Sequence, residues 1–323
     1  MNTATKIGGF ALGIVVAFGG AAGVGAVVGP LDDAPVESAA DHDMGGESEG
    51  DHDTASHDDS EPAAATDLPG GLMVSQNGYT LELADSELSR SEGGTLRFRI
   101  LGPDGEPVTE YTEEHGKDLH LIVVRRDLGG YQHVHPTLNE HGEWSIALDL
   151  SEPGTYRVFA DFAPAGAEPL TLGTDLSVPG DYDPRPLPPP VRTAEVDDYT
   201  VTLDGTLVPG EQSKLTLSVS KNGKPVTDLQ PYLEAYGHLV ALRDGDLAYL
   251  HVHPDGSPVD GSTKPGPEIT FYATTPTVGD YRLFLDFRHG DVVRTAEFTA
   301  RAGGASVQTG TDEAGGDEHG HGH

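Results

Sequence analysis

The sequence predicts an all-β protein with two tandem β-sandwich domains. One observation behind this prediction is an internal duplication, in which a pattern of histidine, arginine and tyrosine recurs at a constant spacing of 118 positions. The matched positions are His120, Arg125, Tyr131 and His133-Val-His-Pro136 in the first copy, and His238, Arg243, Tyr249 and His251-Val-His-Pro254 in the second. The other observation is that each copy consists of short β-branched and aromatic runs between turn residues, without a long helical period.

In the first copy, turn residues delimit seven strand-length segments. These are Tyr79–Leu83, Thr95–Leu101, Leu119–Arg125, Tyr131–His135, Glu143–Leu150, Thr155–Phe162 and Leu170–Val178. Seven strands in about 105 residues are typical of a β-sandwich.

Two tyrosines refine the fold prediction. Residues 154–156 and 279–281 read Gly-Thr-Tyr and Gly-Asp-Tyr, and each follows a Pro-bearing loop and opens an apolar strand. This pattern matches the tyrosine corner of immunoglobulin-like domains. Val158 and Leu283 stand where such domains often carry a cysteine, and the chain has no cysteine at all. The sequence therefore predicts immunoglobulin-like sandwiches without the inter-sheet disulfide.

The first thirty residues are a separate segment. Ile7 to Pro30 contains no charged residue, and about 20 apolar residues are enough to span a bilayer. Lys6 precedes this run and acidic residues follow it, which predicts a single-pass membrane protein whose body is extracytoplasmic. A retained anchor is favoured over a cleaved signal peptide because the run is longer than a usual signal core. Cleavage would make the protein secreted.

Composition sets the remaining boundaries. The acidic, histidine-containing stretch after the anchor has few large apolar residues and is expected to be a disordered tether. The proline-rich stretch between the copies is expected to be a semi-rigid polyproline II linker. The predicted segments are 1–30 (anchor or signal), 31–70 (tether), 71–178 (first sandwich), 179–193 (linker), 194–302 (second sandwich) and 303–323 (disordered histidine-containing tail).

Charge and cysteine content exclude several functions. The formal net charge of −34 excludes a nucleic-acid-binding protein that works by phosphate neutralisation, and metal ions or cationic partners are its natural complement. The absence of cysteine excludes thiolate metal sites and cysteine nucleophiles.

The matched histidines are expected to meet on one face of a hairpin. In the second copy Asp244-Gly-Asp246 supplies a turn, which places His238 opposite His251 or, if the register slips by two, opposite His253. Both registers keep all three histidines on one face, close enough for metal–nitrogen distances near 2 Å. The equivalent set in the first copy is His120, His133 and His135.

Two aspartates are candidate additional ligands. Asp161 and Asp286 alternate with the corner tyrosines along the next strand, which turns them away from the core. In an immunoglobulin-like strand order they would neighbour the first histidine of each set, either as fourth ligands or as hydrogen-bond acceptors for the ligands. Ordinary edge residues are the alternative. His115, His141 and His289 have no match in the other copy and are expected at the surface.

Imidazole ligands without thiolates favour Cu(II), with zinc as the second choice. The two histidine motifs, the anchor, the tether and the stretch from Ala235 to Arg243 resemble a group of actinobacterial membrane-anchored or secreted proteins with tandem sandwich domains. Those proteins are often described as heavy-metal-binding or linked to copper handling. The resemblance covers most of the chain and implies a connection with copper.

The leading functional hypothesis is a membrane-tethered, extracytoplasmic metal-binding protein that acts as a copper buffer, a chaperone or an accessory to a metal transporter. The alternative is a non-enzymatic immunoglobulin-like interaction module of the cell envelope with structural histidines. An enzyme is not expected, because neither copy offers paired carboxylates or a nucleophile motif beside the histidines.

The strands that carry the histidines are apolar on both faces. Ile122 and Phe159 are expected on the histidine face, while Leu121 and Val123 point the other way. A sheet with two apolar faces needs cover on both sides. We therefore expect the two repeats to pack together through their histidine sheets; the alternative is that this face binds a separate partner.

Overall fold

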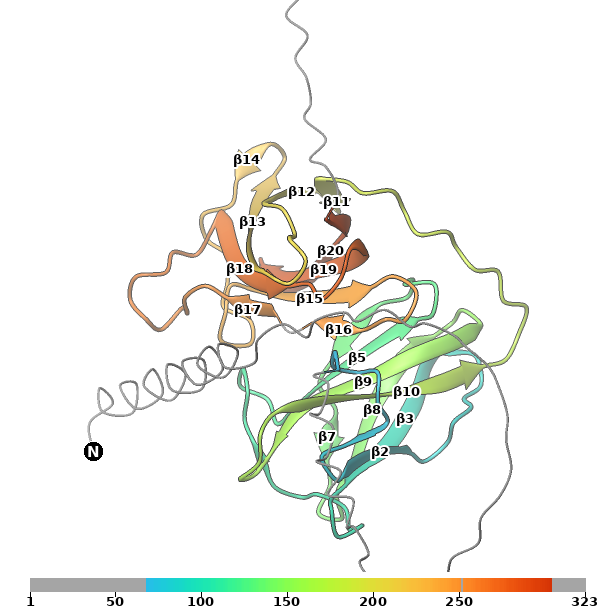
Figure 1. Ribbon diagram of the computed structural model, residues 1–323. Helices are drawn as coiled ribbons and strands as arrows, with labels where there is room; N and C mark the ends of the chain where they lie inside the picture. Colours follow the sequence, from blue (N-terminus) through green and yellow to red (C-terminus); the bar gives the residue numbers. More distant parts are fainter. Residues whose placement is uncertain (1–67, 251, 304–323) are drawn as a thin grey trace, which may run out of the picture. The chain divides into compact units, whose positions relative to one another are not determined.

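A computed structural model describes residues 68–250 and 252–303 (Figure 1). All regular elements in this part of the chain are β-strands, and they form two β-sandwiches, as the sequence predicts. No helix with the length and apolar character needed to cross a bilayer occurs in these two ranges. The predicted anchor, nearly all of the tether and the C-terminal tail, and His251 lie outside the described residues.

The first sandwich contains ten strands. They are β1 (Ser75–Gln76), β2 (Tyr79–Leu83), β3 (Ser91–Leu101), β4 (Tyr111–Thr112), β5 (Leu119–Arg125), β6 (Gln132–Val134), β7 (Thr137–Leu138), β8 (Glu143–Leu150), β9 (Gly154–Pro164) and β10 (Leu170–Val178). One sheet has the order β1-β2-β3-β8-β7, and the other has the order β10-β9-β5-β6 with β4 paired to β9. Trp144 and Phe98 from one sheet meet Leu121 and Val158 from the other in the core.

The second sandwich repeats this plan. Its strands are β11 (Thr193–Val196), β12 (Tyr199–Asp204), β13 (Gln212–Lys221), β14 (Lys224–Pro225), β15 (Gly237–Arg243), β16 (Tyr249–Leu250), β17 (Val252–Pro254), β18 (Glu268–Thr274), β19 (Gly279–His289) and β20 (Val292–Ala302). The sheets have the orders β11-β12-β13-β18-β17 and β16-β15-β19-β20, and β14 pairs with β13. Phe271 and Leu217 of one sheet share the core with Leu239 and Leu285 of the other.

Both predicted tyrosine corners are present. The hydroxyl of Tyr156 donates a hydrogen bond of 2.8 Å to the carbonyl of Glu152. The hydroxyl of Tyr281 donates an equivalent bond of 2.8 Å to the carbonyl of Thr277. Each buried phenol thereby ties the loop before its strand to the sandwich, which supports the immunoglobulin-like description.

The histidine hairpins adopt the slipped one of the two expected registers. In the first repeat Ile122 pairs with His133, and in the second repeat Leu242 pairs with Tyr249. Continued along the strands, the first pairing brings His120 opposite His135. Because alternate residues of a strand share a face, His133 and His135 lie on the face that also carries His120.

After this shared start the second hairpin diverges from the first. The chain leaves β16 at Leu250, and β17 pairs with β18 of the opposite sheet, with His253 beside Tyr272. The longer connection that follows, from Pro254 to Glu268, compares with Pro136 to Glu143 in the first repeat. The first repeat also crosses to its other sheet, but later in the chain, where β7 pairs with β8. His253 is exposed on β17.

The histidine faces of the two repeats are packed together, as expected. All seven residues of β5 are buried; Leu121 points into its own sandwich, and Ile122 points into a third apolar cluster. We call this cluster the inter-repeat core; its buried members are Ile122, Val124, Leu128, Phe159, Val240, Leu242, Leu247, Tyr249 and Phe284. Buried apolar residues from both sequence copies thus make one continuous contact.

Aromatic contacts in the inter-repeat core are reciprocal. Tyr131 of the first repeat stacks on Phe284 of the second, with ring centroids 3.9 Å apart and an interplanar angle of 4°. Tyr249 of the second repeat, which matches Tyr131, lies against Phe159 of the first at 5.6 Å. Matched residues therefore exchange partners across the contact, as in a pseudo-symmetric pair.

Segments outside the strands also join the two repeats. The carbonyl of Gly70 accepts a hydrogen bond of 2.9 Å from the backbone N–H of Tyr249, and the N–H of Gly71 donates to Thr171 at 2.8 Å. Gly71 has φ 72°, and a Cβ there would collide with the ring of Phe159, so this position requires glycine. In the linker, Leu187 packs against the inter-repeat core.

Candidate metal centre

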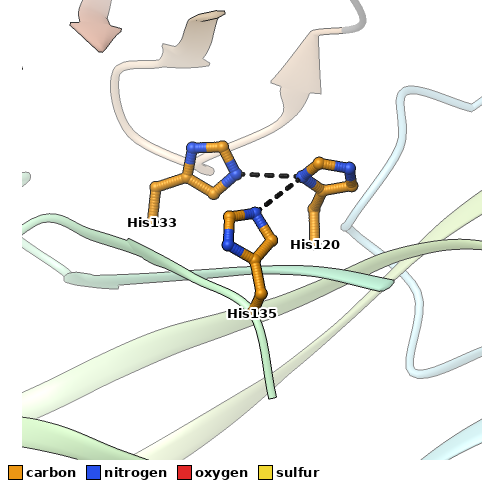
Figure 2. A group of neighbouring side chains, drawn as sticks. All are labelled: His120, His133 and His135. Carbon is orange, nitrogen blue, oxygen red and sulfur yellow. Dashed lines mark hydrogen bonds between the residues drawn. The ribbon is translucent and has the colours of Figure 1, made fainter. Parts of the chain in front are cut away.

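Three histidines of the first repeat converge at the end of the β5–β6 hairpin (Figure 2). We call His120, His133 and His135 the histidine trio. His120 Nδ1 lies 3.1 Å from His133 Nε2 and 3.2 Å from His135 Nε2. One nitrogen from each ring lies within 4.8 Å of the other two, and within the described ranges no other cluster of histidine and acidic side chains meets this condition. The strands thus aim three ligand atoms at one point.

The outer nitrogens of two trio rings are already engaged. His120 Nε2 lies 3.0 Å from the carbonyl oxygen of Glu114. His133 Nδ1 lies 2.8 Å from Oδ2 of Asp286. A carbonyl and a carboxylate only accept hydrogen bonds, so both outer nitrogens carry the proton. In the neutral imidazoles the inner nitrogens, His120 Nδ1 and His133 Nε2, are therefore both lone-pair atoms.

Two lone pairs 3.1 Å apart repel each other unless something positive lies between them. A second proton on His120 is opposed by burial, which lowers the pKa of His120 from 6.5 to about 4. A metal ion between the two nitrogens fits the geometry. Nitrogens bound tetrahedrally at about 2.05 Å lie about 3.3 Å from one another, close to the spacing seen here.

The third ring is also held neutral. Burial, followed by the nearby rings of His133 and His120, lowers the pKa of His135 from 6.5 to about 3. Metal ions bind the neutral imidazole and compete with protons for its lone pair. At neutral pH, His120 and His135 are therefore neutral imidazoles, which is the form that binds a metal.

The two predicted aspartates lie outside the trio, as hydrogen-bond acceptors. Asp286 on β19 accepts from His133 at 2.8 Å and from the hydroxyl of Thr295 at 2.6 Å. Asp161 on β9 is the strand partner of His120, and it accepts from Thr171 at 2.8 Å and from the hydroxyl of Tyr249 at 3.4 Å. Of the two roles expected for these carboxylates, the described contacts match orientation of neighbouring groups.

A small cavity adjoins the trio. Its volume is about 40 Å³, and its polar lining includes His115, His120, His133, Asp161 and His238. This space is sufficient for a water molecule, which needs about 10–15 Å³ of such volume. Because residues of both repeats line it, the cavity lies at their contact.

His238 of the second repeat joins the first cluster. Its ring centroid lies 5.9 Å from those of His120 and His133. Its Nε2 donates to the carbonyl of Leu233 at 2.9 Å, so Nδ1 keeps the lone pair, as in His120. Burial lowers the pKa of His238 to about 3.

The structure does not bring the second predicted set together in its described part. His238 lies beside the histidine trio, whereas His253 lies on β17 in the opposite sheet. The third member, His251, lies outside the described residues. A second ion site formed by these three histidines stays a prediction.

Some residues of the site were not found from the sequence. His115 was expected at the surface, but its ring lies 5.1 Å from that of His238 and it lines the cavity. His289, also expected at the surface, lies away from the site, with its Nδ1 2.6 Å from the hydroxyl of Tyr199. The carbonyl of Glu114, which accepts from His120, is a backbone group and cannot be identified from a pattern of side chains. Thr295 lies opposite Asp286 as Thr171 lies opposite Asp161, a correspondence that the strand pairing shows and the spacing of 118 positions does not.

Comparison with known proteins identifies the repeat unit. A family model described as a domain of unknown function (DUF8832) matches residues 74–178 and again residues 194–304. The two matches coincide with the two sandwiches. A comparison with curated proteins gives no match.

Solved structures with similar folds include three examples. FdeC, an adhesin of Escherichia coli, is 15% identical over 71% of this chain and 65% of its own, with a TM-score of 0.23. A putative membrane anchored protein from Corynebacterium diphtheriae is 12% identical over 71% and 60%, with a TM-score of 0.22. The tandem Ig repeats of Dlar are 8% identical over 69% and 96%, with a TM-score of 0.19. This chain spans less than two thirds of the first two, and similarity at this level does not bear on function.

Proposed function

The chain belongs to the family described as a domain of unknown function (DUF8832), and from this premise we propose that it is an extracytoplasmic metal-binding protein. The histidine trio would hold one divalent transition-metal ion. The observation that carries the proposal is the pair of lone-pair nitrogens, His120 Nδ1 and His133 Nε2, facing each other 3.1 Å apart. A metal ion between them removes their repulsion and satisfies His135 Nε2 as well.

Ligand chemistry selects among metals. Three imidazoles without a thiolate favour Cu(II) by the general affinity order, with Zn(II) second. The cavity beside the trio offers space for a water molecule as a further ligand. When bound, the ion would sit on a folded domain that the predicted N-terminal anchor tethers outside the membrane. Such a protein suits a role as a copper buffer, a chaperone or an accessory to a metal transporter.

The test is a titration of the metal-free full-length chain with Cu(II) and with Zn(II), followed by calorimetry. The double variant His133→Ala/His135→Ala should lose one equivalent relative to the unmodified chain. His141→Ala is the matched control, because this histidine is on the same repeat but its side chain is 78% exposed. Measuring the difference between chains removes any contribution from histidines in the predicted tether and tail.

Equal stoichiometry in the double variant and the control would refute the proposed site. If the unmodified chain also bound neither ion, the alternative of an immunoglobulin-like interaction module with structural histidines would take its place. That module would be identified by a partner that binds without added metal.

A further inference from the structure

One hydrogen bond connects a ligand of the proposed site to the other sequence copy. His133 Nδ1 of the first repeat lies 2.8 Å from Asp286 Oδ2 of the second, and the side chains are only 4% and 3% exposed. We infer that the second repeat completes the metal site of the first. Asp286 is a positioning residue for His133, and metal occupancy is coupled to packing of the two repeats. This inference rests on the proposed function.

Asp286 can do this because its own position is fixed. It lies on β19 in the middle of the sheet, between β15 and β20, and it is 2% exposed. The hydroxyl of Thr295 on β20 donates to its other oxygen at 2.6 Å. A buried carboxylate held in this way has one oxygen left for an outside donor, and His133 supplies that donor. Without His133, part of a buried negative charge would lose its partner at considerable cost.

The effect of this carboxylate on a metal ligand has two parts. By accepting the proton of Nδ1, Asp286 fixes the tautomer of His133 and directs the Nε2 lone pair toward the other two rings. It also makes the imidazole a stronger electron donor. Ligation in turn makes the Nδ1–H group more acidic, and the hydrogen bond to Asp286 becomes stronger. Ion binding and this contact therefore stabilise each other.

The matched aspartate provides a comparison within the same molecule. Asp161 occupies the corresponding place on β9, and Thr171 donates to it as Thr295 does to Asp286. Its donor from the other repeat is the phenol of Tyr249 at 3.4 Å. Asp161 therefore has the same setting at the contact, but it also lines the cavity beside the trio. The control carboxylate is instead Asp280, which lies on the same strand as Asp286 and faces Arg301.

Metal binding is coupled to packing of the repeats because the ligand His133 and its acceptor Asp286 come from different repeats. If the repeats separate, His133 loses its acceptor and the site loses affinity. Thermodynamic linkage then requires that bound metal favours the packed arrangement by the same factor. Removal of an acceptor of this kind lowers metal affinity by about 10–100-fold.

The experiment measures Zn(II) affinity of the full chain by competition with a chelator, for the unmodified protein, Asp286→Asn and Asp280→Asn. We expect Asp286→Asn to bind about 10–100-fold more weakly and Asp280→Asn to match the unmodified chain. Circular dichroism and thermal unfolding without metal verify that each variant is folded.

A second measurement needs no substitution. Hydrogen exchange of the unmodified chain with and without Zn(II) should show slower exchange in β19 and β15, although the trio belongs to the first repeat. Protection confined to β5 and β6, or equal affinity of the two aspartate variants while the unmodified chain binds zinc, would overturn the inference and leave the proposed function intact. Absence of zinc and copper binding by the unmodified chain would overturn the proposed function itself.

Discussion

Burial sets the charge of the histidines at the site. It lowers the pKa of His120 to about 4 and those of His135 and His238 to about 3, from an ordinary value of 6.5. In the unfolded chain the same rings regain their ordinary pKa. Between pH about 6.5 and about 4 the unfolded state therefore binds protons that the native state does not, and the free energy of unfolding falls as the pH falls.

The metal-free protein should therefore lose stability as the pH falls. Its stability should be greatest above pH about 6.5 and decline toward pH about 4, and His135→Asn should decline less steeply because one of these protons is no longer taken up. Urea unfolding at a series of pH values in the presence of a chelator measures the slope. His141→Asn, at an exposed position, should keep the slope of the unmodified chain. An equal slope in His135→Asn would contradict the burial argument.

At the scale of residues, the sequence identified the trio but not all of its surroundings. Duplication singled out His120, His133 and His135 because matched imidazoles survived among drifted neighbours. The contact of His133 with Asp286 could not be predicted from the sequence. It joins residues 153 positions apart, and it depends on how two separately folded sandwiches dock, which no strand periodicity encodes.

The tyrosine corners are the local elements with the clearest energetic role. Tyr156→Phe removes the hydroxyl that reaches Glu152 and leaves the rest of the ring in place. The expected loss is about 1 kcal/mol of unfolding free energy, the usual net value of one such hydrogen bond. Denaturant unfolding of the full chain measures it, with Tyr182→Phe as a control because Tyr182 is exposed. A loss no larger than the control would show that the corner bond contributes little, and metal stoichiometry should not change.

At the scale of elements, four of the seven strands predicted in the first copy have the bounds that the structure shows, and the other three are longer or shorter. The four are Tyr79–Leu83, Leu119–Arg125, Glu143–Leu150 and Leu170–Val178. The strand pairing of the second histidine hairpin was not predicted, because it was inferred from the first repeat. From Val252 onward β17 hydrogen-bonds to β18, whereas the matched Val134 of the first repeat still pairs with β5. A duplicated motif thus predicted shared strands but not shared pairing.

For the whole molecule, the two-sided apolar character of β5 and β15 is explained by the inter-repeat core. Residues on one face of each strand fill the core of its own sandwich, and residues on the other face meet the opposite repeat. The face that we considered as a possible docking site for a separate partner is therefore covered by the chain itself. A charged residue introduced into the inter-repeat core should separate the two repeats and leave each sandwich folded.

Phe159 and Phe284 are the residues with which to test that expectation. Both are fully buried, and both belong to the inter-repeat core and to neither sandwich core. A glutamate at each position would place an unpaired charge in an apolar contact, which is strongly unfavourable until the repeats separate and water reaches it. Small-angle scattering of residues 68–303 should therefore change from a compact profile to an extended two-body profile in Phe159→Glu/Phe284→Glu. Trp144 fluorescence, which reports on the first sandwich core, should stay native.

Val259→Glu is the control for added charge, because Val259 is 91% exposed, and its profile should stay compact. Separation of the repeats also withdraws Asp286 from His133. The double variant should therefore bind Zn(II) as weakly as Asp286→Asn does, although neither phenylalanine touches the ion. A variant that separates but keeps full affinity would show that the trio works without the second repeat. A variant that stays compact would show that the linker and the Gly70 contact hold the repeats together without the aromatic core.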